Sequence, residues 1–206
     1  MSTELQRNLR KASRKGALET VQDLLERQHV DVNARGACGG TALYFGARHG
    51  HTQVVQYLLR RHNAQDTPDH SGATALRVAI EHGHLECVQA LLEHSRERMN
   101  TPDATGWCPL HIAGWAGNIE AVDLLLQHKA ELNWRNNEGR TPLHLAACYH
   151  HIEVATKLLE AGADPNVADM NGVTALHLAT ESTPSPSTTQ VTPVTSSHRS
   201  IARAVV

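Results

Sequence analysis

Histidine and cysteine are the residues of this chain with the clearest potential for chemistry. The 206 residues include 15 histidines and 4 cysteines, and imidazole and thiolate are ligands that zinc prefers. The triplet His-Gly-His occurs at 49–51 and again at 82–84. Zinc holds its ligands at about 2 Å, whereas neighbouring helices pack about 10 Å apart, so triplets on adjacent helices are too far apart to share one ion. No cysteine or carboxylate completes either set, and we expect neither a metal ion nor another cofactor.

A nucleophilic cysteine is the second chemistry to consider. Cys108 lies three residues before His111 in the sequence Cys-Pro-Leu-His. A nucleophile needs a base within reach and a third group that orients the base. Here the spacing belongs to a recurring helix start in which cysteine replaces the usual threonine, and no third group accompanies it. The chain also lacks a glycine-rich phosphate loop and a paired-carboxylate cleft, so we expect it not to be an enzyme.

The elements that must position these residues are copies of one repeated unit. Five segments align in sequence, and their anchoring leucines follow one another at intervals of 33, 34, 33 and 33 residues. A degenerate copy precedes them, with Leu9 placed 34 residues before the first anchor. The anchoring leucines are Leu43, Leu76, Leu110, Leu143 and Leu176.

Each unit predicts two short helices. A threonine such as Thr141 caps a free backbone N–H, and the proline that follows suits the first helical position. A glycine seven residues after the leucine suits a left-handed turn, and a second apolar helix follows. His150 replaces that glycine in one unit, so it either accepts the left-handed conformation or reshapes the turn. Because one unit cannot bury its own apolar face, the units are expected to stack into a solenoid.

The segment Thr141-Pro142-Leu143-His144-Leu145-Ala146 resembles the T-P-L-H-x-A signature of ankyrin repeats, and the resemblance extends over about residues 5–181. It implies an all-α solenoid of helix-turn-helix units with hairpin loops. It also implies a structural hydrogen-bonding role for the histidine of the signature. The predicted units are a degenerate N-terminal cap at 5–38, complete repeats at 39–71, 72–105, 106–138 and 139–171, and a partial repeat at 172–181.

The segment 182–206 is rich in serine, threonine and proline and is predicted to be a disordered tail. It follows a repeat that lacks its second helix, although solenoids normally close with a polar capping unit. Either the tail covers the open end, or the chain is a shortened product of a longer protein. We favour the second interpretation.

The ankyrin resemblance also implies where a partner would bind. In that family, variable columns at the hairpin tips and at the ends of the first helices line one concave face. Aromatic residues are only 3% of this chain, yet two tryptophans and a tyrosine fall in these columns. Large aromatics and arginine are enriched in binding hot spots, and exposed apolar patches mark contact sites. The expected partner-binding residues are Trp107, Trp115, Arg140, Tyr149, Arg48, His49, Glu81 and His82.

These features predict a non-enzymatic scaffold or adaptor that recognises a protein partner. The alternative is the substrate-recognition arm of a larger multidomain protein, such as an ankyrin-bearing ubiquitin ligase. A net charge of −2 and a pI near 6.7 give no case for nucleic acid as a partner. The absence of a signal-peptide pattern and of any long apolar run predicts no membrane partner. We expect a monomer in the cytoplasm, the nucleus or both.

The N-terminal segment Arg-Asn-Leu-Arg-Lys-Ala-Ser-Arg-Lys, residues 7–15, is strongly basic. We interpret this segment as the exposed face of the opening helix. The alternative is a nuclear-import signal or a surface for an acidic partner. Its Ser13 also fits a basophilic kinase site.

Overall fold

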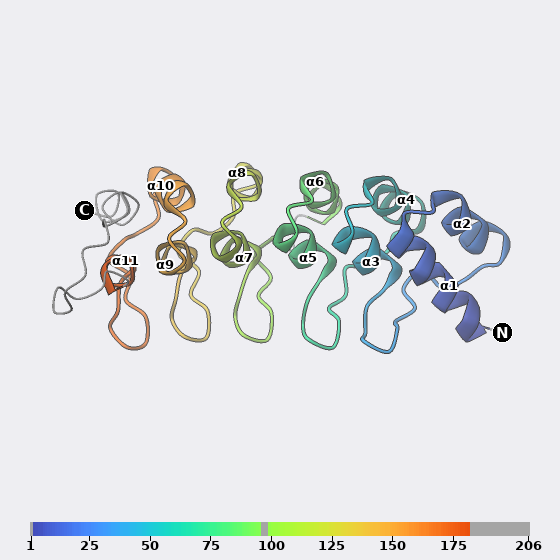
Figure 1. Cartoon of the computed structure of the whole chain (residues 1–206), viewed down its shortest axis with the longest axis horizontal. Coiled ribbons are helices and arrows are strands. Elements are labelled where there is room, and N and C mark those ends of the chain that lie inside the picture. The colour runs from blue at the N-terminus through green and yellow to red at the C-terminus, as the bar shows by residue number, and fades with distance from the viewer. Residues whose placement is uncertain (1, 96–98, 182–206) are drawn as a thin grey trace, which may run out of the picture. The chain divides into compact units, whose positions relative to one another are not determined.

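The computed structural model of the chain describes residues 2–95 and 99–181 (Figure 1). The chain divides into two compact units, Met1–Met99 (unit 1) and Asn100–Val206 (unit 2). This boundary falls inside the predicted repeat 72–105. The part of the chain that the structure describes is helical, with an isolated bridge between Ala168 and Thr174 and no named strand, which confirms the all-α prediction. The predicted disordered tail lies outside the described residues.

Unit 1 contains three helix pairs. The first helices pack side by side, α3 against α1 and α5, and the second helix α4 packs against α6. Hairpin loops project beside the row of first helices (Figure 1). The first helices are α1 (Ser2–Lys15), α3 (Ala42–Arg48) and α5 (Ala75–Glu81). The second helices are α2 (Leu18–Gln22), which continues as the π-helical turn η1 (Asp23–Arg27), α4 (Thr52–His62) and α6 (Leu85–His94).

Unit 2 repeats the arrangement, with two complete pairs and one further first helix. Here α9 packs between α7 and α11, and α10 packs on both α8 and α9. The first helices are α7 (Pro109–Ala116), α9 (Pro142–Cys148) and α11 (Ala175–Glu181), and the second helices are α8 (Ile119–Gln127) and α10 (Ile152–Glu160). No helix in the described ranges of either unit has the length and apolar content needed to cross a membrane.

The helix starts follow the predicted chemistry. The Thr41 hydroxyl accepts the N–H of Tyr44 at 3.2 Å, and the Thr74 hydroxyl accepts that of Arg77 at 3.1 Å. Pro142 opens α9 directly after Thr141. Each cap satisfies a backbone donor that has no partner inside its helix. The threonine positions therefore set where α3, α5 and α9 begin.

The turns between paired helices also follow the prediction. Glycines at 16, 50, 83 and 117 have φ between 69° and 72°, the left-handed region that glycine enters without steric cost. His150 accepts the same conformation, with φ 60°. A Cβ built on Gly117 would lie 2.5 Å from Nδ1 of His151. The glycine is thus required by close approach of the next repeat as well as by its own φ.

The anchoring leucines form the core of each unit. Leu9, Leu43, Leu76, Leu110 and Leu143 are at most 3% exposed. In the predicted first repeat, Leu24 and Leu25 of the π-helical turn are also buried. Leu176, in the last described helix, is only half-buried.

Candidate partner-binding site

The histidine of the signature ties each repeat of unit 2 to the next. Nδ1 of His144 accepts the backbone N–H of Thr141 at 3.1 Å, and Nε2–H donates to the carbonyl oxygen of Val173 at 3.1 Å. His111 makes the equivalent contacts to Cys108 and Arg140. Burial lowers the pKa of both rings, that of His111 to about 4. The neutral ring is the form that can make both bonds, which agrees with a structural role.

Carboxylate groups fix the hairpin tips of unit 2. Oδ1 of Asp169 accepts the N–H groups of Asn171 and Val173 at 2.8 and 3.0 Å. Burial acts to raise the pKa of Asp169, but these backbone donors and Arg140 outweigh it and lower the pKa. At an earlier tip, Oδ1 of Asp103 accepts the N–H of Trp107 at 2.9 Å. The tip residues are therefore held on a rigid backbone.

Three of the predicted binding residues come together in unit 2. The ring centroids of Trp107 and Trp115 are 6.4 Å apart at 69°, and those of Trp115 and Tyr149 are 6.3 Å apart at 86°. Trp115 is 36% exposed and Tyr149 51% exposed, whereas Trp107 is half-buried. Edge-to-face pairs at such distances are favourable arrangements of aromatic rings. We call Trp107, Trp115 and Tyr149 the aromatic cluster.

His151 extends the aromatic cluster and anchors it. Its ring stacks on Tyr149 at 6.4 Å and 13°, and its Nε2 lies 3.0 Å from the carbonyl oxygen of Trp115. The turn histidine of one repeat thus holds the backbone of the tryptophan in the previous repeat. The sequence pattern did not connect His151 with the binding residues.

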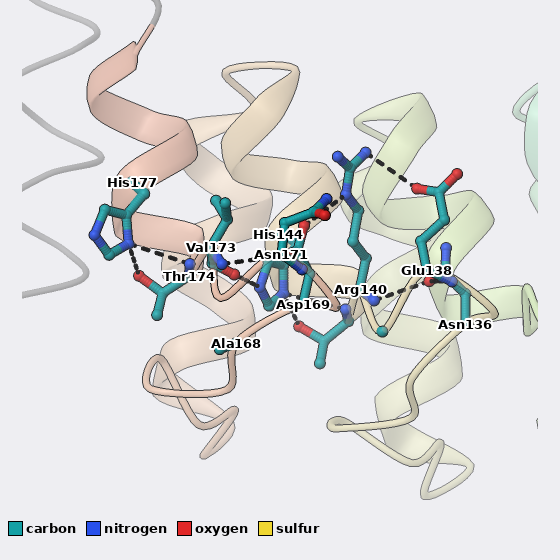
Figure 2. A network of polar contacts seen from close by, with 12 residues as sticks. Asn136, Glu138, Arg140, His144, Ala168, Asp169, Asn171, Val173, Thr174 and His177 are labelled. Atoms are coloured by element: carbon teal, nitrogen blue, oxygen red, sulfur yellow. Dashed lines mark hydrogen bonds and ion pairs between the residues drawn. The ribbon is translucent and has the colours of Figure 1, made fainter.

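Arg140, the fourth predicted binding residue of unit 2, forms ion pairs with two carboxylates. Its Nε lies 3.4 Å from Oδ2 of the buried Asp169, and its Nη1 lies 3.3 Å from Oε2 of the exposed Glu138 (Figure 2). The Asp169 side chain is 1% exposed, and that of Arg140 30% exposed. Arg140 therefore braces two neighbouring hairpins and presents only part of its guanidinium group to solvent.

The predicted residues of unit 1 are placed differently. Arg48 is exposed and donates from Nη1 to the hydroxyl of Tyr44 at 3.1 Å. His49 and His82 are exposed at the ends of α3 and α5, and each stacks on the histidine two residues later. Glu81 is half-buried and pairs with Arg77 at 2.8 Å. No ring-to-ring contact joins any of these four residues to another of the four.

Cys108 and His111 lie close together but are poorly suited to nucleophilic catalysis. Sγ lies 2.9 Å from Nδ1, yet both residues are at most 1% exposed. Burial raises the pKa of Cys108 to about 11 and lowers that of His111. The pair is thus a neutral thiol and a neutral imidazole at physiological pH, whereas a reactive cysteine needs its thiolate.

Spacing bears on the metal-site hypothesis, and burial bears on the kinase-site hypothesis for Ser13. Within residues 2–95 and 99–181, no group of three or more His, Cys, Asp or Glu side chains is arranged to hold a metal ion. Ser13 is 0% exposed, so the kinase-site hypothesis is wrong for the folded unit.

Met170, at a hairpin tip of unit 2, is 74% exposed. Sequence reasoning missed it because it lies outside the columns considered, and its only signal is a large apolar residue in a turn.

Comparison with known proteins agrees with the architecture. A stretch of 48 residues, 23% of this chain, is 54% identical to the probable E3 ubiquitin-protein ligase XBOS33 of Oryza sativa subsp. japonica. That stretch covers only 9% of the rice protein. The family model for ankyrin repeats, in three copies, matches residues 9–103 and 95–169. With its helix pairs, hairpins and histidine ties, the chain belongs to the ankyrin-repeat family, whose repeats form protein-interaction domains and are generally non-catalytic.

Proposed function

We propose that this chain is a non-enzymatic scaffold or adaptor that recognises a protein partner through the aromatic cluster of unit 2. The observation that carries the proposal is the contact of Trp107, Trp115 and Tyr149 across two repeats, with two of the rings more than a third exposed. Exposed apolar patches of this kind mark contact sites, and tryptophan and tyrosine are the residues most enriched in hot spots.

The cluster is supported by a rigid backbone. Asp103 holds the N–H of Trp107, and His151 holds the carbonyl of Trp115. Ring-to-ring contacts restrict the side chains further. A surface that is ordered before binding loses little conformational entropy when a partner arrives, which favours affinity. In the proposal, Trp115 and Tyr149 provide the central contact area.

Charged residues supply the margin of the proposed site. Arg140 keeps a partly exposed guanidinium beside Glu138, and such an exposed pair can exchange partners at little cost. Unit 1 is proposed to make its own partner contacts, through the exposed residues Arg48, His49 and His82. Glu81 is a weaker candidate, because its pairing with Arg77 would have to be broken.

Affinity capture with matched tryptophan variants tests the proposal. The double variant Trp107→Ala/Trp115→Ala should lose the partners that the unaltered chain retains. Trp134→Ala removes a half-buried tryptophan outside the cluster and should keep them. Circular dichroism checks that both variants fold. Equal recovery of partners by all three proteins would refute the assignment of the aromatic cluster as the binding surface.

The second candidate function is the substrate-recognition arm of a larger ubiquitin ligase. It is favoured by the similarity of 48 residues to a probable E3 ubiquitin-protein ligase. Endogenous protein can be captured with an antibody against unit 2 and its peptides mapped by mass spectrometry. Peptides from outside these 206 residues in the same polypeptide would support the arm, and a ubiquitin-transfer assay of the captured protein would test its activity. A captured polypeptide of only these residues would favour the adaptor.

A further inference from the structure

The first helix of unit 1 carries a basic face. Arg7, Lys11, Arg14 and Lys15 are all exposed. At 3.6 residues per turn, they fall within an arc of about 100°. Leu9 is 1% exposed and lies on the opposite side, against the core. The helix therefore buries one side and presents an almost wholly cationic one.

The cationic surface continues into the next repeat. Arg48 ends α3 at the position that Arg14 holds in α1. A turn histidine fixes each backbone, because Nε2 of His51 lies 3.0 Å from the carbonyl oxygen of Arg14 and Nε2 of His84 lies 3.2 Å from that of Arg48. Since α1 and α3 pack directly, the backbones of the two arginines lie about 10 Å apart. We call Arg7, Lys11, Arg14, Lys15 and Arg48 the basic row.

The basic row has few compensating carboxylates. Glu4, in the first turn and on the same side of the helix as the row, is the only acidic residue of α1. No member of the row takes part in an ion pair with another residue in the described ranges. Arg77 and Arg140, by contrast, are both paired with carboxylates. Clustering like charges without counter-charges opposes folding, so the row needs a reason other than stability.

We infer that the basic row binds an acidic protein segment in extended conformation. An extended chain in the polyproline II conformation advances about 3.1 Å per residue with three residues per turn. Carboxylates three residues apart then lie on the same side of the chain and about 9 Å apart, close to the backbone separation of Arg14 and Arg48. Arg7 and Arg14 on α1 are also about 10 Å apart along the helix, at 1.5 Å per residue. A segment with Glu or Asp at every third position therefore fits the row both along α1 and from α1 to α3.

Two other anionic partners fit the row less well. An amphipathic helix binds a membrane by inserting its apolar face, but the apolar face of α1 is buried against the core. Glu81 holds the same position in the third repeat as Arg14 and Arg48, so the row ends after two repeats. Protein–DNA contacts commonly engage about six to ten phosphates, which is a longer footprint. The short row matches a short peptide segment.

This inference adds a surface in unit 1 and does not depend on the aromatic cluster of unit 2. Fluorescence anisotropy of the full chain with a labelled 15-residue peptide, carrying Glu at every third position among Gly and Ser, tests it. The Lys11→Glu/Arg14→Glu variant should bind about tenfold more weakly. Arg60→Glu/Arg61→Glu, two exposed positions on α4, makes the same charge change elsewhere in unit 1 and should keep binding within about twofold. Raising the salt concentration should weaken the unaltered complex.

Several results would overturn the inference. One is that both charge reversals weaken peptide binding equally, and another is that a peptide with Gln in place of Glu binds equally well. The inference would also fail if the unaltered chain did not bind the peptide at low salt. Tighter binding of the chain to a single-stranded oligonucleotide or to phosphatidylserine vesicles would likewise contradict it. If Lys11→Glu/Arg14→Glu misfolds by circular dichroism, Lys11→Gln/Arg14→Gln decides, with about threefold weakening expected and unchanged binding contradicting the inference. Trp107→Ala/Trp115→Ala should leave peptide binding intact, which separates this test from that of the proposed function.

Discussion

His111 is a buried base whose two hydrogen bonds require it to stay neutral. Burial lowers its pKa to about 4 from the ordinary value of 6.5. Between these values the unfolded chain binds a proton that the folded ring does not, so the free energy of unfolding decreases as pH falls from 6.5 to 4. The loss from this residue is at most about 3 kcal/mol. We expect a clear decrease in melting temperature between pH 7 and pH 4.5.

The variant His111→Gln isolates that effect. Glutamine at this position can still accept from the N-cap backbone, as in a capping box, but it does not titrate. It should be less stable than the unaltered chain at pH 7, because the bond to the carbonyl of Arg140 is weakened or lost. The difference in melting temperature should shrink as pH falls. Parallel pH profiles for the two proteins would contradict the role of His111.

Gly117 is constrained by a neighbour as well as by its φ of 69°. A methyl group there would lie 2.5 Å from Nδ1 of His151, whereas one on Gly172, with φ 78°, would meet nothing within 4 Å. Left-handed strain costs both alanine variants about 1–2 kcal/mol, and displacement of His151 costs Gly117→Ala more. Urea unfolding should therefore show a larger loss for Gly117→Ala. Equal losses would mean that the ring moves freely.

At the residue scale, sequence predicted positions better than contacts. The columns of Trp107, Trp115 and Tyr149 were identified from the repeat, and their rings do meet in unit 2. The pairing of Arg140 with Asp169 was missed because it joins side chains 29 positions apart across a hairpin. The half-burial of Trp107 was also missed, since exposure at a tip depends on side-chain rotamer and neighbouring rings. Repeat spacing carries no information about either.

At the scale of one helix, the start of α7 departs from its family pattern. Cys108 takes the place of threonine, and its thiol is a weak donor and acceptor beside His111. Cys108→Thr should restore a hydroxyl cap and raise the free energy of unfolding by about 1 kcal/mol. The reciprocal change Thr141→Cys, at the start of α9, should lower it by a similar amount. Urea titration measures both, and stabilisation by both changes would contradict the capping argument.

Element boundaries were predictable where local chemistry is strong. Threonine followed by proline or alanine marked the first helices, and left-handed glycines marked their ends. The first repeat was harder, because it lacks the threonine start and its second helix ends in the π-helical turn η1. Such a turn depends on how Leu24 and Leu25 pack against the neighbouring helices, which the degenerate sequence does not reveal. Both leucines are nevertheless buried in the core.

At the scale of the whole chain, the sequence did not predict the division into units at residues 99 and 100. The 34-residue spacing between Leu76 and Leu110 is the only sign of this division in the sequence. An insertion shows where the repeat is irregular, whereas cohesion of a unit depends on the sum of its packing contacts. The basic character of α1, in a chain whose net charge is −2, was visible in the sequence. That the basic row forms no ion pair with another described residue could be seen only from the side-chain positions.

Stability in such a chain should be local. Each helix packs mainly on its partner and on adjacent repeats, as α9 does on α7, α10 and α11, and solenoid stability is approximately a sum of such neighbour terms. Leu143 is 1% exposed in α9, so Leu143→Ala should cost about 2–5 kcal/mol. Native-state hydrogen exchange should place that loss in α9 and the helices it contacts, while amides of α1, which packs on α2 and α3, keep their protection. A uniform loss across all helices would instead mean that the chain opens as one cooperative unit.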